Sequence, residues 1–270
     1  MLKIIIVLLL IFLFSIVKYL CFNNIILDKS IIFSQKVLSK TMLLKNEFKS
    51  SLSNSSLVND VFENIYKSNG WGPYARGSGP GSTLEYTSNM RNQLLNFLIN
   101  HNVQTIMDSS CGSMYWMPHV LESYAKINPG FHFLGLDVTC SLIAQHKLMF
   151  QNNTNWSFQC LDYTQDPLPL GYDVIISRDS LQHLPIKYAF EFLSNVKSSK
   201  AKYLMIGSYL EDPNVNADVP VGGYYSIDVT RAPFNVSPKP YMIFKENPDS
   251  VQKFLLVWKI QDMNWTTSTF

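Results

Sequence analysis

The 270-residue sequence predicts an α/β fold in which helices cover both faces of a mostly parallel sheet. From about residue 61 onward, short apolar runs alternate with stretches of helical spacing, which is the pattern of repeated strand–helix–strand units. Small and acidic residues follow several of the apolar runs, as expected where strands end at the ligand-binding edge of such a sheet. With 47% hydrophobic residues, the chain can bury a sizeable core.

The first 22 residues predict a membrane-spanning segment. Residues 4–17 are apolar except for Ser15, and the apolar run resumes after Lys18, so that together they approach the ~20 residues that a helix needs to cross a bilayer. The Lys18 ammonium can reach the headgroups. A cleaved signal peptide and a helix buried in a soluble protein are the alternatives, but the bulky residues before position 23 offer no cleavage site of small residues. We therefore expect an uncleaved signal anchor, and lysines on both sides leave its orientation open.

Residues 23–60 predict a stem, and residues 61–270 predict one folded domain. The stem is rich in Lys, Ser and Asn, with apolar residues at the spacing of one amphipathic helix. A late strand at 254–260 is expected to pair with 241–245 and to give the sheet an antiparallel edge. The earlier strands are expected at 103–107, 131–138, 156–161, 173–177 and 203–208, and the helices between them at about 116–127, 141–150 and 186–198.

Charge and cysteine spacing argue against two classes of function. The formal charge of +2 comes from 22 basic and 20 acidic residues spread through the chain, without the basic stripe that binds nucleic acid. The four cysteines form no C-x-x-C pair and the chain has no H-E-x-x-H motif, so no metal site is predicted. In an oxidising compartment, Cys140 and Cys160 could pair across the second and third predicted strands.

Polar residues follow the predicted strands at the carboxyl edge of the sheet. The first strand leads into Asp108-Ser109-Ser110-Cys111-Gly112-Ser113, a turn of small residues whose backbone N–H groups can approach a ligand beside a helix N-terminus. A purely structural turn is the alternative interpretation. The second strand ends at Asp137, which is placed to accept both hydroxyls of a ribose, and the third strand ends at Asp162. Three carboxylates at one edge of the sheet predict a binding site.

The segment after the fourth strand predicts a reactive centre. Arg178, Asp179 and His183 place a fixed cation, a carboxylate and a proton acceptor within six residues at the same crevice. A structural Arg–Asp pair with a capping histidine is the alternative. Polar groups that cluster at this edge have little structural reason to be there, and we therefore favour a functional cluster.

Several sequence blocks occur in a fixed order over some 175 residues, from about Gly70 to Lys245. They are Gly70-Trp71-Gly72, Gly79-Pro80-Gly81-Ser82-Thr83-Leu84-Glu85, the turn from Asp108 to Met117, Gly135-Leu136-Asp137, Leu161-Asp162-Tyr163, Arg178-Asp179-x-Leu181-x-His183-Leu184, and Gly223 to Phe234. In these blocks the domain resembles the class I S-adenosylmethionine-dependent methyltransferases. One position departs from the family pattern, because Ser110 stands where the D-x-G-x-G turn has its first glycine.

The resemblance implies a Rossmann-like sheet of about seven strands, with S-adenosyl-L-methionine as the cofactor. It implies that Asp108 and Gly112 hold the methionine end of the cofactor. By the same resemblance, Asp137 holds the ribose and Asp162 the adenine amino group. Further cofactor contacts are expected of Ser110, Cys111, Trp116, Tyr163 and Arg178.

The acceptor side of the site is predicted from the chemistry of methyl transfer. The resemblance makes Gly81-Ser82-Thr83 a flap over the cofactor or the acceptor, and Trp71 suits stacking on a sugar ring. A hydroxyl acceptor needs a general base, for which His183 is the candidate. We expect Asp179 to orient His183 or to bind an acceptor hydroxyl, and Arg178 to support the site.

The predicted anchor and the glycosylation sequons suggest where the acceptor is found. N-x-S/T sequons occur at Asn54, Asn152, Asn155, Asn235 and Asn264, a mild excess over chance that favours a lumenal domain. We expect a single-pass type II protein of the endoplasmic reticulum or Golgi, or a secreted one if the N-terminal segment is cleaved, that O-methylates a sugar hydroxyl of a glycan. The alternatives are a methyltransferase of a small molecule, lipid or protein, and a catalytically inactive cofactor-binding or interaction protein.

Overall fold

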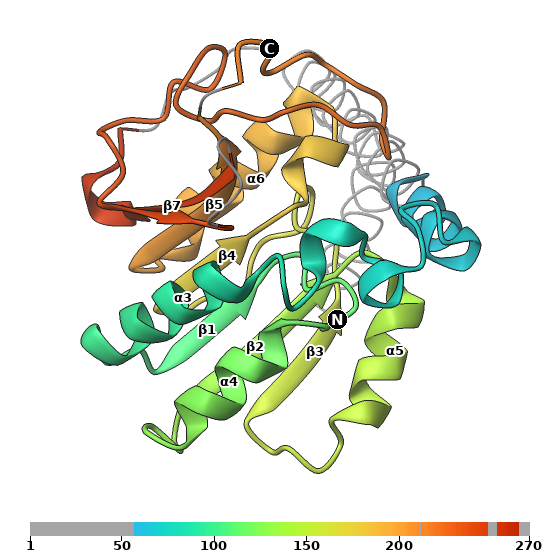
Figure 1. Cartoon of the computed structure of the whole chain (residues 1–270). Coiled ribbons are helices and arrows are strands. Elements are labelled where there is room, and N and C mark those ends of the chain that lie inside the picture. The colour runs from blue at the N-terminus through green and yellow to red at the C-terminus, as the bar shows by residue number, and fades with distance from the viewer. Residues whose placement is uncertain (1–56, 211, 248–252, 265–270) are drawn as a thin grey trace, which may run out of the picture. The chain divides into compact units, whose positions relative to one another are not determined.

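A seven-stranded sheet forms the centre of the computed structural model, which describes residues 57–210, 212–247 and 253–264 (Figure 1). The strand order is β3-β2-β1-β4-β5-β7-β6. β7 runs antiparallel to both of its neighbours, and the other pairs are parallel. The strands are β1 (Thr105–Asp108), β2 (His132–Asp137), β3 (Trp156–Cys160), β4 (Val174–Ser177), β5 (Tyr203–Tyr209), β6 (Met242–Lys245) and β7 (Lys253–Lys259).

Each of these strands lies within two residues of its predicted bounds. The prediction succeeds because central parallel strands are buried on both faces and therefore appear in the sequence as continuous apolar runs. All four residues of β4, for example, are buried. The predicted pairing of a late strand with 241–245 is also confirmed, because β7 pairs antiparallel with β6.

Helices cover both faces of the sheet, as predicted. α3 (Ser88–Asn100) and α4 (Met117–Ala125) lie side by side on one face in Figure 1, and α6 (Ile186–Ser199) lies on the other. Alternation along the strands separates two apolar clusters: Ile106 of β1 belongs to the cluster with α3 and α4, whereas Met107 belongs to the cluster with α6. α5 (Cys140–Met149) follows β2 and precedes β3.

Two helices lie where none is predicted. α3 buries Met90, Leu94, Phe97 and Leu98, whose spacing is helical, but the Asn, Gln and Arg residues between them give the segment a loop-like polarity. A second helix, at 57–68, extends across the predicted end of the stem at residue 60. All the described residues belong to one compact unit, which contains this helix.

The predicted signal anchor lies outside the described residues, as does most of the predicted stem. Within the described ranges, no helix combines the length and the apolar character needed to span a bilayer.

A disulfide joins Cys140 to Cys160, which confirms the pairing predicted for an oxidising compartment. The position of one partner differs from the expectation, because Cys140 is the first residue of α5 and does not lie on a strand. Cys160 is the last residue of β3. Of the other cysteines within the described residues, Cys111 is a buried free thiol.

Candidate functional site

Two adjoining cavities open at the carboxyl edge of the sheet. The larger has a volume of about 380 Å³ and the smaller about 60 Å³. β2 and β3 lie on one side of β1, and β4 and β5 lie on its other side. The strand order therefore reverses between β1 and β4, and a reversal of this kind leaves a crevice for a ligand at the carboxyl ends of the strands. The two cavities form one crevice because their linings share six residues, namely Tyr66, Trp71, Ser110, Gly112, Asp179 and His183.

The three predicted aspartates all lie in this crevice. Asp108 is the last residue of β1 and lines the larger cavity. Asp137 ends β2 and Asp162 follows β3 by two residues, and both line the smaller cavity. All three residues are buried. The parallel register brings these strand ends together, since Asp108 is aligned with Gly135 and Asp137 with Cys160.

Asp137 and Asp162 both keep acceptor capacity toward the smaller cavity. Asp137 accepts the Gly112 N–H at 2.9 Å and the Thr139 N–H at 2.8 Å, one at each oxygen. Asp162 uses only Oδ1, which accepts the N–H of Thr164 at 3.0 Å and its hydroxyl at 2.6 Å. Its buried Oδ2 has no hydrogen-bond partner in the part of the chain that the structure describes. Such an atom needs a donor, and a ligand in the cavity could supply one.

Asp108 is poised to titrate near neutral pH. Burial and, to a lesser extent, the neighbouring Asp137 raise its pKa against the lowering effects of the Ser110 N–H and Arg178, and the net result is a pKa of about 7. Its one hydrogen bond to the following turn, from the Ser110 N–H to Oδ1, is long at 3.3 Å. A cationic group bound in the larger cavity would favour the ionised form of Asp108.

The turn after β1 requires glycine at one position and not at another. Gly112 has a φ of +52°, and a Cβ there would lie 3.0 Å from both the Ser78 hydroxyl and the Tyr66 hydroxyl. Ser110, which replaces the expected glycine, does not adopt a positive φ. The backbone conformation at position 110 therefore does not require glycine. Cys111 lines the larger cavity, and burial raises the pKa of its thiol.

His183 is held as a neutral ring with a free acceptor nitrogen. It ends the 3₁₀ turn η3 (Leu181–His183), and its Nδ1 lies 2.7 Å from the Gly223 carbonyl oxygen. A carbonyl only accepts hydrogen bonds, so Nδ1 carries the proton and Nε2 bears the lone pair. Burial lowers the pKa of His183 despite opposing contributions from Gly223 and Asp179. Its ring packs 4.8 Å from that of Trp71, between centroids.

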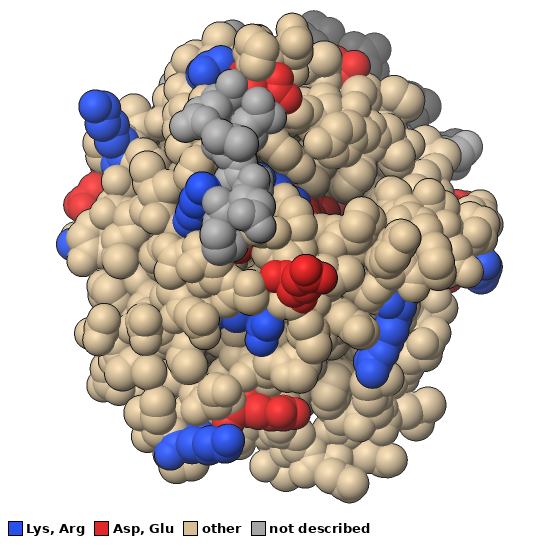
Figure 2. All heavy atoms as spheres, in the orientation of Figure 1, with Lys and Arg blue, Asp and Glu red and all other residues tan. Residues whose placement is uncertain are grey.

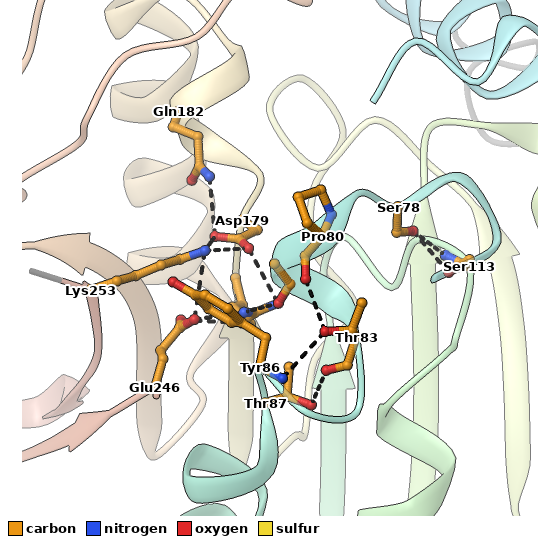
Figure 3. Close-up of polar contacts among 12 residues, drawn as sticks. Ser78, Pro80, Thr83, Tyr86, Thr87, Ser113, Asp179, Gln182, Glu246 and Lys253 are labelled. Atoms are coloured by element: carbon orange, nitrogen blue, oxygen red, sulfur yellow. Dashed lines mark hydrogen bonds and ion pairs between the residues drawn. The ribbon is translucent and has the colours of Figure 1, made fainter. Parts of the chain in front are cut away.

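The expectation that Asp179 orients His183 is wrong, because the Gly223 carbonyl takes that position. Asp179 instead joins a network of charged residues (Figure 3). Its carboxylate lies 3.2 Å from Arg178 Nη1 and 2.5 Å from Lys253 Nζ, and Oδ1 accepts a hydrogen bond from Gln182. Burial alone would raise the pKa of Asp179, but Arg178 and Lys253 outweigh it and hold the pKa well below its usual range. The side chain is 17% exposed, so an ionised acceptor faces the crevice.

Arg178 connects this network to Glu246 and to the Gly81 carbonyl. Its Nε and Nη2 donate to Glu246 at 3.1 and 2.6 Å, and Nη2 also donates to the Gly81 carbonyl at 2.7 Å. The guanidinium lies 5.7 Å from the ring centroid of Trp116, which lines the larger cavity. Because all three nitrogens are engaged within the protein, the arrangement suits support of the site better than direct contact with a cofactor.

Four residues are predicted on the acceptor side, namely Trp71 and the flap residues Gly81, Ser82 and Thr83, and three of them lie at the crevice. Trp71, Gly81 and Ser82 line the larger cavity. Thr83 lines neither cavity. Its hydroxyl donates to the Pro80 carbonyl at 3.0 Å and accepts the Tyr86 N–H at 3.2 Å, so it stabilises the turn (Figure 3). The predicted contact between Thr83 and the substrate therefore has no support from this arrangement.

Ser78, three residues before the flap, is hydrogen-bonded to the turn after β1 (Figure 3). Its hydroxyl lies 3.0 Å from that of Tyr66, accepts the Ser113 N–H at 3.0 Å and donates to the Ser113 hydroxyl at 2.8 Å. The Ser113 hydroxyl in turn donates to the Ala75 carbonyl at 2.7 Å. Sequence reasoning missed these residues because their partners are 12 to 38 positions apart.

Two further residues of the charged network lie at this edge of the sheet, and one of them, Lys253, lines the larger cavity. Glu246 directly follows β6, and Lys253 begins the antiparallel β7, so both lie at the same edge as the carboxyl ends of β1 to β5.

Aromatic residues line both cavities. Tyr163, which is predicted to contact the cofactor, lines the smaller cavity and is hydrogen-bonded to the Ser180 hydroxyl. The aromatic residues that also line the larger cavity are Tyr66, Tyr86, Tyr115, Tyr209 and Tyr224.

Comparisons with solved structures identify the type of fold. No protein-family model matches the chain, and no curated protein matches it either. Among solved structures, magnesium protoporphyrin IX methyltransferase from Synechocystis PCC 6803 with bound S-adenosylmethionine matches with a TM-score of 0.52 and 14% identity, over 75% of this chain and 95% of that one. The same enzyme with bound S-adenosylhomocysteine matches with a TM-score of 0.50 and 13% identity, over 75% and 97% of the two chains.

The fold is that of the S-adenosylmethionine-dependent methyltransferases. The sheet of this methyltransferase fold has the seven strands that the sequence resemblance implied, with β7 as the antiparallel strand. The crevice described above lies at the carboxyl edge of that sheet, where folds of this kind bind their ligands.

Proposed function

We propose that the protein is an S-adenosylmethionine-dependent methyltransferase that methylates a sugar hydroxyl. Two buried carboxyl groups support this choice of cofactor. In the smaller cavity, Oδ2 of Asp162 is buried and has no hydrogen-bond partner among the described residues, and in the larger cavity the carboxyl group of Asp108 titrates near pH 7. S-adenosylmethionine offers an adenine amino group to Asp162 and an ammonium group to Asp108. Asp137 lies in the same small compartment as Asp162 and has lone pairs left for the ribose hydroxyls.

The cofactor supplies a methyl group already activated on a sulfonium, so the protein must align an acceptor and remove its proton. Nε2 of His183 accepts that proton, because Gly223 holds the ring in the required tautomer and burial keeps it neutral. Asp179, ionised at neutral pH, accepts a hydrogen bond from a second hydroxyl of the acceptor. Alignment of the two reactants and the general base each lower the barrier by several kcal/mol.

The lining of the larger cavity supports a sugar as the acceptor. Flat aromatic surfaces and hydrogen-bonding groups alternate there, with the indole of Trp71 next to the His183 ring and Tyr86 and Tyr209 around Lys253. Aromatic faces stack on the C–H surface of sugar rings, while the polar groups bind ring hydroxyls.

The proposal includes a type II topology, with the N-terminal segment as membrane anchor and the catalytic domain in the lumen of the endoplasmic reticulum or Golgi. Two observations support a lumenal domain. The Cys140–Cys160 disulfide is a bond that oxidising compartments maintain. The sequon residues Asn152, Asn235 and Asn264 are exposed, so glycans would fit there without disturbing the fold.

The test compares His183→Ala with the wild-type protein in two assays. Calorimetric titration with S-adenosylhomocysteine measures cofactor affinity, and transfer of labelled methyl to a glycan panel measures turnover. We expect turnover to fall by about 10²- to 10⁴-fold with cofactor affinity preserved, because the lost group acts only on the acceptor proton. Wild-type turnover should also fall as pH decreases, with an apparent pKa below the usual ~6.5 of histidine.

His119→Ala is the matched control, because His119 is exposed on α4 and lines neither cavity. Unchanged turnover in His183→Ala would remove His183 from the mechanism. Cofactor binding without transfer to any acceptor would indicate a cofactor-binding interaction protein, and absence of binding would refute the methyltransferase proposal.

A further inference from the structure

The Cys140–Cys160 disulfide connects the two strand ends that carry Asp137 and Asp162. Cys140 follows Asp137 by three residues, and Cys160 precedes Asp162 by two. In the sheet, Asp137 and Cys160 are direct register partners. The covalent bond therefore lies immediately beside the two carboxylates of the smaller cavity.

Short, buried backbone links transmit the position of each cysteine to its neighbouring carboxylate. Val138 and Thr139, the residues between Asp137 and Cys140, are both buried, and the Thr139 N–H is bonded to the Asp137 carboxylate. On the other side, the Leu161 N–H donates to the Asp137 carbonyl at 3.0 Å. A shift of one strand end relative to the other would therefore change the distance between the two carboxylates.

Other contacts hold the start of α5 but do not replace this link. The Asn59 side chain donates to the Val138 carbonyl at 2.5 Å, and the Glu63 carboxylate accepts the N–H and the hydroxyl of Ser141 at 2.8 and 2.7 Å. Both side chains come from the helix at 57–68, so they connect α5 to that helix and not to β3. The disulfide is the covalent tie between β3 and the start of α5.

The disulfide is also accessible to reductants. Cys140 is exposed and Cys160 is half-buried, whereas the free thiol of Cys111 is buried. We propose that the Cys140–Cys160 disulfide is a positioning element of the cofactor site, and that its reduction weakens cofactor binding. This inference rests on the proposed function, since it assumes that Asp137 and Asp162 hold an adenosyl ligand.

The redox step is an ordinary thiol–disulfide exchange. Dithiothreitol attacks one sulfur, the Cys140–Cys160 bond breaks, and the reagent leaves as its cyclic disulfide. The two hydrogens and two electrons lost by the reagent appear on the two cysteine thiols. The link between β3 and α5 is then lost, while the remaining sheet hydrogen bonds keep the domain folded.

The experiment titrates the full-length protein with S-adenosylhomocysteine in three forms: oxidised, treated with dithiothreitol, and as the double variant Cys140→Ser with Cys160→Ser. We expect Kd to rise about tenfold on reduction and to the same extent in the double variant, because small misplacements of binding groups have effects of this size. Binding stoichiometry should stay the same. The KM for S-adenosylmethionine should rise with kcat preserved.

Stoichiometry separates positioning from simple stabilisation. If the disulfide only stabilised the fold, its loss would reduce the fraction of protein that binds and leave the Kd of the folded fraction unchanged, which would overturn the inference. The double variant should not respond to dithiothreitol, and a response would assign the effect to another cysteine. Equal Kd values in the oxidised and fully reduced protein overturn the inference alone, whereas absence of binding in every form refutes the proposed function with it.

Discussion

At the scale of single residues, Asp108 gives the proposed cofactor site a predicted pH dependence near neutrality. Burial raises its pKa to about 7, so the carboxyl is protonated below that pH and ionised above it. Only the ionised form attracts the ammonium of the ligand, and we expect S-adenosylhomocysteine affinity to increase as pH rises through about 7. Calorimetric titrations between about pH 6 and pH 8.5 would measure this.

Asp108→Asn is the informative variant for this prediction, since it keeps the shape of the side chain and removes the titration. Its affinity for S-adenosylhomocysteine should be lower than that of the wild-type protein above pH 7 and nearly constant across the range. A wild-type protein with constant affinity over the same range would show that Asp108 does not contact the ammonium.

The sequence predicts those site residues that lie at the ends of strands, and it does not predict those that long-range strand pairing brings to the crevice. Asp108 and Asp137 end strands that are apparent as apolar runs, and His183 lies in the segment that follows such a strand, so the rule for the carboxyl edge finds all three. Glu246 and Lys253 lie 68 and 74 positions from their partners Arg178 and Asp179. Their roles depend on the antiparallel pairing of β7, and no local pattern indicates which charges such a pairing brings together.

At the scale of elements, the flap over the larger cavity depends on a few hydrogen bonds. The flap, Gly81-Ser82-Thr83, is the end of a segment that includes the 3₁₀ turns η1 (Tyr74–Gly77) and η2 (Pro80–Ser82) and is held through Ser78. Ser78→Ala removes the hydroxyl that binds Tyr66 and Ser113 and leaves the Ser113 N–H without its acceptor. We expect the free energy of unfolding to fall by about 1–3 kcal/mol, and affinity for S-adenosylhomocysteine to fall as well, because the flap covers the turn after β1.

Chemical denaturation and calorimetry would test this prediction, with Ser68→Ala as the control. The Ser68 hydroxyl donates to the Ile65 carbonyl at 3.3 Å in an exposed position, so its loss should change stability by less than about 0.5 kcal/mol. Equal stability of the two variants would mean that the flap is held by packing alone.

The strands of this fold have clearer sequence signals than helix α3 has. Strand signals depend on runs of apolar residues that the fold buries on both faces. Helix signals depend on a contrast between two faces, and in α3 that contrast is weak because Asn89, Asn92 and Asn96 are interspersed with the buried residues. Tertiary packing against α4 and β6 therefore decides the structure of α3.

At the scale of the whole molecule, the surface gives little indication of the ligand. On the face shown in Figure 2, basic and acidic side chains are interspersed, in line with a formal charge of only +2. Long-range attraction of a charged partner is therefore weak on this face. Under the proposed function, the paired and buried charged groups of the crevice set the selectivity for the acceptor.

The proposed lumenal location predicts that some of the sequons carry glycans. The Nδ2 atom of asparagine carries the glycan, and in Asn155 this atom donates to the Pro129 carbonyl at 2.7 Å in a half-buried side chain. Asn152, Asn235 and Asn264 are exposed. In full-length protein from animal cells, we expect glycans at Asn152, Asn235 and Asn264 and none at Asn155, because only the exposed amides leave room for a sugar in the folded domain.

Enzymatic deglycosylation followed by peptide mass spectrometry would identify the occupied residues, because release of the glycan converts each of them to aspartate. Asn152→Gln should remove one glycan, and Asn155→Gln should leave the pattern unchanged. A glycan at Asn155 would mean that its bond to Pro129 does not protect it. If no asparagine of residues 57–264 carries a glycan, the catalytic domain does not enter the lumen, and the argument for a glycan acceptor loses its support from location.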